Sequence, residues 1–400
     1  MTITRGDAIS LDAADELRTF VDEFVPADAG PDGRPIVYLD GNSLGRPPKR
    51  TVQRLHDVLH TEWASSLIRS WDAQDPAPGR GRWLELPQRV GDLLAPLIGA
   101  GPGEVVVHDS TTVNLYQLVH GALGLRRDRC TIAVDPGDFP TDRYVVDGIA
   151  ASTGVAIRHG FDDLDDVAVV VRSVVDYRSA EVVDIVAETA RIHAAGALVI
   201  WDLSHAAGVL AVDLHAAGAQ LAVGCTYKFL NGGPGAPAFS YVARELQAAI
   251  SQPIWGWFSQ VDQFEIGPVY LPRSDIGRVL IGTPSILSLS AAEAGISLSL
   301  DAGIDRIERK ARALTSFALD LCDQFGLASS TPRDPARRGG HVNVVHPDAR
   351  RITQRLAAER GVLGDFRAPD VVRLGLSPLS TRFADVFDGV EAVRDLAADA

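Results

Sequence analysis

Short apolar runs alternate with amphipathic segments through the middle of the chain, and this alternation most constrains the fold. Six runs have the continuously apolar, β-branched composition of buried strands, at 104–108, 130–134, 155–159, 167–175, 197–202 and 221–227. Helical patterns separate them at 111–123, 141–152 and 182–196. Strands that are apolar on both faces and alternate with helices are typical of a parallel sheet covered on both sides. We therefore expect an α/β fold with a mostly parallel sheet.

The pattern changes near residue 290, where strongly helical sequence begins. Weaker strand patterns follow at 341–346 and 371–377, and helical patterns at 351–361 and 383–399. A chain of 400 residues exceeds what one compact core usually organises, so we expect a large and a small domain. The expected parts are an N-terminal segment that packs on the small domain (1–60), a large cofactor-binding domain (61–300) and a small α+β domain (301–400).

The composition is that of an ordinary globular protein, and it disfavours several classes of partner. A net charge of -14 argues against nucleic acid and anionic membranes as partners. Cys130, Cys225 and Cys322 are too few and too far apart for a disulfide framework or a metal site. No signal core opens the chain, and no apolar run approaches the roughly 20 residues of a membrane span. We expect a cytoplasmic protein that binds no metal.

Lysine is rare in this chain, with three lysines against 35 arginines. Lys49 and Lys310 lie in polar sequence and are expected to be solvated. Lys228 instead follows an apolar strand pattern and precedes the glycine-rich stretch NGGPGAP. A lysine amine can lose its proton and attack a carbonyl, which a guanidinium cannot do. Chance is the competing explanation, because the arginine bias can reflect base composition alone.

Polar residues follow three of the predicted strands, at the sheet edge where ligands bind in α/β folds. Ser110, Thr111 and Thr112 open a helix after the first strand and could cradle a phosphate, although they could equally be a plain helix cap. Asp202 ends a buried strand with His205 three residues on. A buried carboxylate needs a cationic or hydrogen-bonding partner such as a protonated pyridine nitrogen, although the pair could equally be a capping aspartate beside a core histidine. Tyr227 and Lys228 follow the next strand.

The order of these three groups matches the needs of pyridoxal 5′-phosphate. The cofactor requires a phosphate anchor, an acid beside its pyridine nitrogen and a lysine for its aldehyde. Each element is weak evidence by itself, but the ordered combination is specific. The chain has no dinucleotide fingerprint, P-loop or HExxH sequence that would favour another cofactor.

The chain resembles the kynureninase family almost end to end. The most specific stretches are GNSLG (41–45), FPTD (139–142), TYKFLNGGPG (226–235) and GDFRAPDVVRLGLSPL (364–379). Further matches are IRSW (68–71), LPQRVGDLLAPLIGA (86–100), DSTTVNLYQLV (109–119), WDLSHAAG (201–208), GWF (256–258), GTPSILSLSAAE (282–293) and RGGHVNV (338–344). The resemblance implies a fold-type I, aspartate aminotransferase-like enzyme that carries pyridoxal phosphate and works as a homodimer.

The resemblance also implies roles for individual residues. Lys228 would bind the cofactor and shuttle the α-proton, Asp202 would pair with the pyridine nitrogen, and Tyr227 would transfer a proton. The other implied cofactor contacts are Thr111, Thr112, Phe139, Thr141, Asp142, His205, Tyr227, Trp257 and Thr283, of which Trp257 and Thr283 would come from a second subunit. Arg373 would bind the substrate α-carboxylate, Asn42 and Ser43 would line the amino-acid end, and Trp83 would flank the aryl ring unless it is a core residue.

The implied reaction is hydrolysis of L-kynurenine, or a ring-substituted kynurenine, to anthranilate and L-alanine. Compared with the usual family motifs, Trp255, Ser259 and Gln260 replace residues near the interface and Ser380 replaces a late tyrosine. These departures leave the aryl substituent of the substrate open. The alternatives are another pyridoxal-phosphate reaction, such as a lyase, aminotransferase or desulfurase, and a non-catalytic binding protein. Intact Asp202 and Lys228 disfavour the binding protein.

Overall fold

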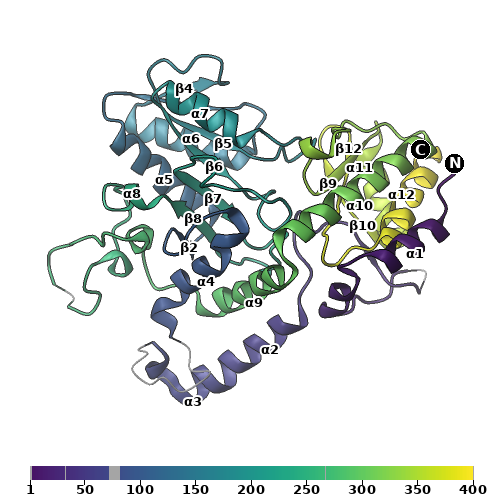
Figure 1. The fold of residues 1–400 in the computed structure, drawn as a ribbon, viewed down its shortest axis with the longest axis horizontal. Coiled ribbons are helices and arrows are strands. Elements are labelled where there is room, and N and C mark those ends of the chain that lie inside the picture. The colour runs from purple at the N-terminus through teal and green to yellow at the C-terminus, as the bar shows by residue number, and fades with distance from the viewer. Residues whose placement is uncertain (1, 32, 72–81, 266, 400) are drawn as a thin grey trace.

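The structure is a computed structural model that describes residues 2–31, 33–71, 82–265 and 267–399. Its centre is a seven-stranded sheet with the strand order β2-β8-β7-β6-β5-β3-β4 (Figure 1). The strands are β2 (Val105–His108), β3 (Thr131–Val134), β4 (Ala156–His159), β5 (Val167–Ser173), β6 (Leu198–Asp202), β7 (Leu221–Cys225) and β8 (Ala238–Val242). β8 runs antiparallel to both of its neighbours, and the other pairs are parallel. The predicted α/β fold with a mostly parallel sheet is confirmed.

Helices cover both faces of this sheet, and its strands are largely buried except for the edge strand β4. α5 (Thr111–Leu125) and α6 (Pro140–Thr153) pack Leu115 and Ile149 against Ile132 and Val169 on one face. α4 (Leu86–Leu94), α7 (Ile185–Ala194) and α9 (Ile286–Ala302) cover the other face. A short α8 (Arg244–Gln247) follows the last strand. The helices predicted at 111–123, 141–152 and 182–196 correspond to α5, α6 and α7.

A second unit with its own apolar core follows α9. An antiparallel sheet with the order β11-β12-β9 comprises β9 (His341–Val345), β11 (Asp365–Arg367) and β12 (Val371–Gly375). The helices α10 (Ile304–Phe325), α11 (Ala349–Arg360) and α12 (Phe383–Ala398) pack on it. A two-stranded parallel pair, β1 (Val37–Tyr38) with β10 (Val362–Leu363), ties the N-terminal segment to this unit.

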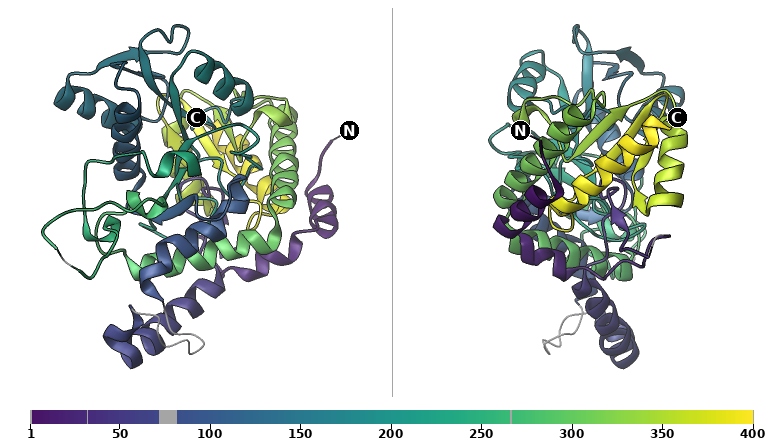
Figure 2. Two further views of the ribbon diagram at one scale, coloured as in Figure 1. Left: turned by 60° about the vertical axis from the view of Figure 1, so that its left-hand side comes forward. Right: turned by 90° about the vertical axis from the view of Figure 1, so that its right-hand side faces the viewer.

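The N-terminal segment contacts both units. α1 (Arg5–Ala14) packs against α12 of the small unit, whereas α2 (Lys49–Asp57) packs against α9 of the large one. α2 and the short α3 (Ala64–Ser66) form an arm that projects from the body (Figure 2). The domain limits at 60 and 300 stay a prediction. Within the described ranges, no helix is both long enough and apolar enough to cross a membrane.

Lys310 corrects one expectation from the sequence. Its side chain is 3% exposed, and its ammonium lies 2.6 Å from the Asp15 carboxylate, which is also buried. Lys310 is therefore an internal ion-pair partner that fixes the N-terminal segment to α10, and it is not a solvated cation.

Candidate active site

The strand ends singled out in the sequence meet around one cavity of about 250 Å³. β6 ends at Asp202, the chain after β7 carries Tyr227 and Lys228, and α5 begins three residues after β2. β8 separates β2 from β7, yet both strands point the same way because β8 is antiparallel to each. The predicted residues that line the cavity are Thr111, Thr112, Phe139, Thr141, Asp142, Asp202, His205, Tyr227 and Lys228.

Lys228 points its amine into this cavity. The Lys228 Nζ lies 3.0 Å from His205 Nε2 and 5.9 Å from the ring centroid of Phe139. Burial and then the charge of Lys228 lower the pKa of His205 well below its usual value. The imidazole is therefore neutral and can accept a hydrogen bond from the amine.

A set of carboxyl groups lies on the same cavity. Asp202 is 7% exposed and accepts hydrogen bonds from the Ser204 amide at 2.8 Å and the Ser204 hydroxyl at 2.6 Å. Burial, and then the charge of Asp202, raises the pKa of Asp142 well above its usual value. This pKa shift favours the neutral form of Asp142 beside Asp202, and a cationic ring nitrogen would pair with the buried charge of Asp202.

The N-terminus of α5 contains a helix cap and also places two threonines on the cavity. The Ser110 hydroxyl caps the helix by accepting a hydrogen bond from the Val113 amide at 3.3 Å. Thr111 and Thr112, the first residues of the helix, line the cavity. Their hydroxyls and the amides of the first turn can therefore bind an anion while Ser110 supplies the cap.

These residues fit pyridoxal 5′-phosphate. The first turn of α5 suits the phosphate, Phe139 suits the ring face, Asp202 suits the pyridine nitrogen, and Lys228 suits the aldehyde carbon. Within the described part of the chain, no group of three or more His, Cys, Asp or Glu side chains is placed to hold a metal ion.

Arg373, Asn42 and Ser43 are not among the residues that line the Lys228 cavity; Arg373 lies on β12, and its side chain is 1% exposed. Its guanidinium donates to the Ser43 hydroxyl at 3.0 Å and to the Tyr177 carbonyl at 2.7 Å. The Asn42 amide oxygen, in the orientation that satisfies its neighbours, accepts from Arg373 Nε at 2.9 Å. The three residues predicted to bind the amino-acid end of the substrate are therefore in mutual contact.

Gly45 joins the GNSLG turn to the lysine segment. Its amide donates to the Tyr227 carbonyl at 2.7 Å, and a Cβ at this position would lie 2.4 Å from the Lys228 carbonyl oxygen. Only glycine allows this close approach between backbones. The turn that holds Asn42 and Ser43 is thereby fixed against the segment that holds Lys228.

Three predicted residues lie elsewhere in the chain. Trp83 is buried and donates from its indole to Glu62 at 2.7 Å, so within one chain it is a core residue and not a wall of the cavity. Trp257 and Thr283 line a separate apolar cavity of about 460 Å³ with Ile68 and Trp71. Nothing in the local sequence marks Glu62 as the partner of Trp83, because helix and loop patterns do not specify such distant pairs.

Comparison with known proteins supports the chemistry of the cavity. Residues 307–393 match the family described as Kynureninase C-terminal domain. A kynureninase from Pseudomonas fluorescens is 40% identical, over 98% of this chain and 95% of that protein. One from Deinococcus radiodurans is 42% identical, over 96% of this chain and 95% of that protein. The chain belongs to the kynureninase family.

Solved structures of more distant proteins share the kynureninase chain's fold. A cysteine desulfurase from Thermococcus onnurineus superposes with a TM-score of 0.77 at 16% identity, covering 91% of this chain and 95% of its own. A C-DES variant with glycine covalently linked to its pyridoxal-phosphate cofactor gives a TM-score of 0.75 at 15% identity, covering 90% and 96%. At such identities the likeness shows the fold alone.

The departures from the usual kynureninase motifs lie in two separate places. Trp255 stacks on Tyr270 with a centroid distance of 4.8 Å, and the Tyr270 hydroxyl donates to Ser259 at 3.0 Å. Gln260 accepts from the Leu271 amide at 2.6 Å, so these three departures stabilise one loop outside the Lys228 cavity. Ser380 is buried in the small unit, between β12 and α12.

Several residues that line the Lys228 cavity went unnoticed in the sequence, namely Ser173, Val175, Tyr177 and Ser204. Ser173 ends β5, so the rule that ligands bind at strand ends could have identified it. The predicted strand ran to residue 175, which hid this end. Tyr177 follows in a turn and stands edge-on to Phe139, with ring centroids 5.3 Å apart.

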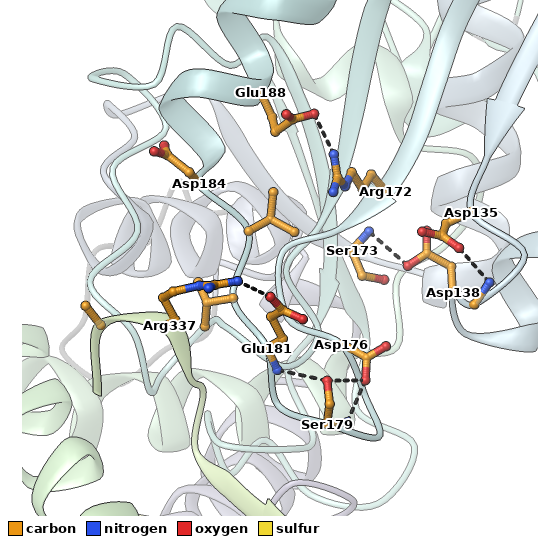
Figure 3. A pocket seen from close by; sticks show the side chains of 14 residues that line it. Asp135, Asp138, Arg172, Ser173, Asp176, Ser179, Glu181, Asp184, Glu188 and Arg337 are labelled. Atoms are coloured by element: carbon orange, nitrogen blue, oxygen red, sulfur yellow. Dashed lines mark hydrogen bonds and ion pairs between the residues drawn. The ribbon is translucent and has the colours of Figure 1, made fainter. Parts of the chain in front are cut away.

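A larger cavity of about 840 Å³ lies beside the first, and Ser173 lines both (Figure 3). Two of the acidic side chains that line this larger cavity pair with arginines. Glu188 accepts a hydrogen bond from Arg172 at 2.5 Å, and Glu181 forms an ion pair with Arg337 of the small unit. Asp138 differs from both, because its carboxylate accepts a long hydrogen bond of 3.4 Å from the Ser173 amide, and its buried Oδ2 has no hydrogen-bond partner among the described residues.

We expect Asp138→Asn to stabilise the protein at alkaline pH. Burial raises the pKa of Asp138 to about 7, so the folded state holds an extra proton between pH 4 and 7 and loses stability as the pH rises through this range. The variant should therefore melt roughly 2–4 °C higher than the wild type at pH 8, with a smaller difference at pH 5. Exposed Asp128→Asn is the control, and a difference that grows towards pH 5 would contradict the assignment.

Proposed function

We propose that the chain is a pyridoxal-phosphate-dependent hydrolase that converts L-kynurenine and water to anthranilate and L-alanine, in tryptophan catabolism. The observation that carries this proposal is the joint placement of Lys228, Asp202 and the first turn of α5 on one cavity. Similarity to kynureninases over nearly the whole chain supports the same reaction.

Each cavity residue has a role that follows from its chemistry. Pyridoxal phosphate, when bound, supplies an electron sink that makes the α-proton of the amino acid acidic. Lys228 binds the cofactor and carries that proton, while neutral His205 holds the amine at 3.0 Å. Asp202 keeps a proton on the ring nitrogen, and Thr111 and Thr112 bind the phosphate.

Tyr227, which lines the cavity, is the proposed carrier of the second proton. The neighbouring Cys225 thiol and burial raise the pKa of Tyr227 above its usual value, so the phenol is a proton donor at neutral pH. Water adds its hydroxyl to the acyl carbon of the side chain, the bond between that carbon and Cβ breaks, and Cβ takes up a proton. The acyl fragment leaves as anthranilate and the remainder as alanine.

The desulfurase alternative lacks a nucleophile. Cys225 and Cys322 are buried, Cys130 is exposed at the start of β3, and none of the three lines the Lys228 cavity. A desulfurase needs a cysteine that reaches the substrate sulfur. The likeness to cysteine desulfurases is therefore one of fold and not of mechanism.

The test of this proposal is incubation of the purified protein with L-kynurenine and cofactor. Release of fluorescent anthranilate together with alanine supports hydrolysis. Cofactor binding without anthranilate would instead favour a lyase or aminotransferase reaction on another amino acid. Ring-substituted kynurenines in the same assay define the aryl preference.

We further propose a cytoplasmic homodimer in which each cavity is completed by the partner. The apolar cavity that Thr283 also lines has exposed apolar side chains around it. Trp257 and Phe264 are 39% and 62% exposed, and Ile68, which follows α3 in the chain, is 77% exposed. Apolar side chains gathered in this way are typical of a protein interface. Trp257 and Thr283 would then reach the phosphate site of the partner.

Mixed dimers test this arrangement. Lys228→Ala and Trp257→Ala, each of low activity alone, should recover activity when co-expressed, because one site of each hybrid then has both native residues. Random pairing makes half of the dimers hybrids, so we expect about a quarter of wild-type activity. Each variant co-expressed with itself is the control, and activity no higher than those controls would show that the sites are not shared.

A further inference from the structure

The GDFRAPD stretch contains a carboxylate to which the proposed function gives no role. Asp365 on β11 is the direct cross-strand neighbour of Arg373 on β12. Side chains of directly paired residues lie on the same face of a sheet. The Asp365 carboxylate accepts two hydrogen bonds from the guanidinium, from Nε at 2.8 Å and from NH2 at 2.6 Å. This two-point pairing fixes the plane of the guanidinium.

We propose that Asp365 is a positioning residue that holds Arg373 ready for the substrate α-carboxylate and so sets selectivity for α-carboxylate ligands. The inference rests on the proposed function only in taking an amino acid as the ligand. Arg373 is almost wholly buried, and burial alone lowers its pKa, whereas the hydrogen bonds and charge of Asp365 oppose that effect. A partner carboxylate is what allows a charged guanidinium to remain at this depth.

The contacts of Arg373 show which edge is offered to the ligand. Asp365 takes the edge formed by Nε and NH2. The Asn42 amide oxygen, in the orientation given above, also accepts from Nε. The other edge donates from NH1 to the Tyr177 carbonyl and from NH2 to the Ser43 hydroxyl, and Tyr177 lines the Lys228 cavity. Both of those acceptors are neutral and bind a guanidinium less strongly than a carboxylate does. An incoming α-carboxylate can displace them while Asp365 keeps its place.

Arg367 offsets the repulsion between the Asp365 carboxylate and an incoming α-carboxylate. Its guanidinium donates to Asp365 Oδ2 at 2.5 Å, and the Ser43 hydroxyl donates to the same oxygen at 3.2 Å. Asp365 is therefore shared between two cations and leaves part of the charge of Arg373 uncompensated. That charge lies at the edge that contacts Ser43 and Tyr177, and Tyr177 lines the Lys228 cavity.

The test compares the holoenzyme with Asp365→Asn, which keeps the shape of the side chain and removes its charge. We measure the dissociation constants of L-alanine and L-alaninamide by titration of the cofactor absorbance, together with kcat and KM for L-kynurenine. In the variant the dissociation constant of L-alanine should rise about tenfold or more, and that of L-alaninamide should stay unchanged. KM for L-kynurenine should rise by a much larger factor than kcat falls. A merely structural role would weaken both ligands alike.

Glu359→Gln is the control, because it removes a carboxylate from an exposed ion pair with Arg355 in the same unit and should change neither constant. If Asp365→Asn does not fold, Asp365→Glu replaces it, since a displaced carboxylate should still weaken L-alanine selectively. Unchanged preference for L-alanine over L-alaninamide in the folded variant overturns the inference. Absence of anthranilate from the wild type would overturn the proposed function alone, because the two ligands report on Arg373 without turnover.

Discussion

Lys228→Ala is expected to abolish kynurenine hydrolysis and to remove the visible absorbance of the lysine-bound cofactor. The Lys228 amine lies in the cavity, 3.0 Å from the neutral imidazole of His205 and 5.9 Å from the ring centroid of Phe139. Alanine can neither bind the aldehyde carbon nor carry the α-proton. Removal of such a nucleophile and proton carrier costs on the order of 10³-fold or more in kcat.

Lys49→Ala is the matched control for this prediction. Lys49 is exposed and donates to the Asp22 carbonyl, far in sequence from every strand end that forms the cavity. The control should keep its colour and its activity. A Lys228→Ala protein that retains the absorbance band, or more than about a hundredth of the activity, would contradict the role of Lys228.

Asp202→Asn is expected to give the second largest loss, with kcat reduced about 10²–10³-fold. In the proposed function the buried Asp202 carboxylate keeps a proton on the ring nitrogen, and asparagine has nearly the same shape without the charge. Cofactor should still bind through Lys228 and the first turn of α5. The absorbance titration therefore checks that the loss lies in catalysis and not in cofactor binding.

Ser204→Ala distinguishes the charge of Asp202 from its position. Ser204 donates two hydrogen bonds to Asp202, one from its amide and one from its hydroxyl, and the variant removes only the second. We expect kcat to fall about tenfold or less in Ser204→Ala, because a single hydrogen bond contributes about 1 kcal/mol. Equal losses in Asp202→Asn and Ser204→Ala would mean that orientation dominates over charge.

Local pattern was enough to predict most of the sheet and the location of the cavity. Apolar strand runs and their polar ends are encoded within a few residues, so β2 to β7 and the group of Asp202, His205 and Lys228 could be predicted. β8 was missed because it follows the glycine- and proline-rich stretch 232–237 and is antiparallel, which interrupts the alternation of strands and helices.

Hydrogen bonds and ion pairs between residues of distant segments could not be predicted from the sequence. Lys310 is buried because Asp15 reaches it from the N-terminal segment, and Trp83 is a core residue because Glu62 accepts its indole hydrogen. Arg373 could be assigned a carboxylate ligand from its family motif. Its partner Asp365 became visible only when the register of β11 and β12 placed the two side chains opposite each other.

Hydrolysis in ¹⁸O-labelled water tests the central claim most directly. If water attacks the acyl carbon in the cavity of Lys228, anthranilate formed from L-kynurenine must carry at least one ¹⁸O in its carboxylate, and alanine must appear in equal amount. Mass spectrometry of the products during the first turnovers measures both. Unlabelled anthranilate, or alanine without anthranilate, would contradict hydrolysis of the bond between Cβ and the acyl carbon.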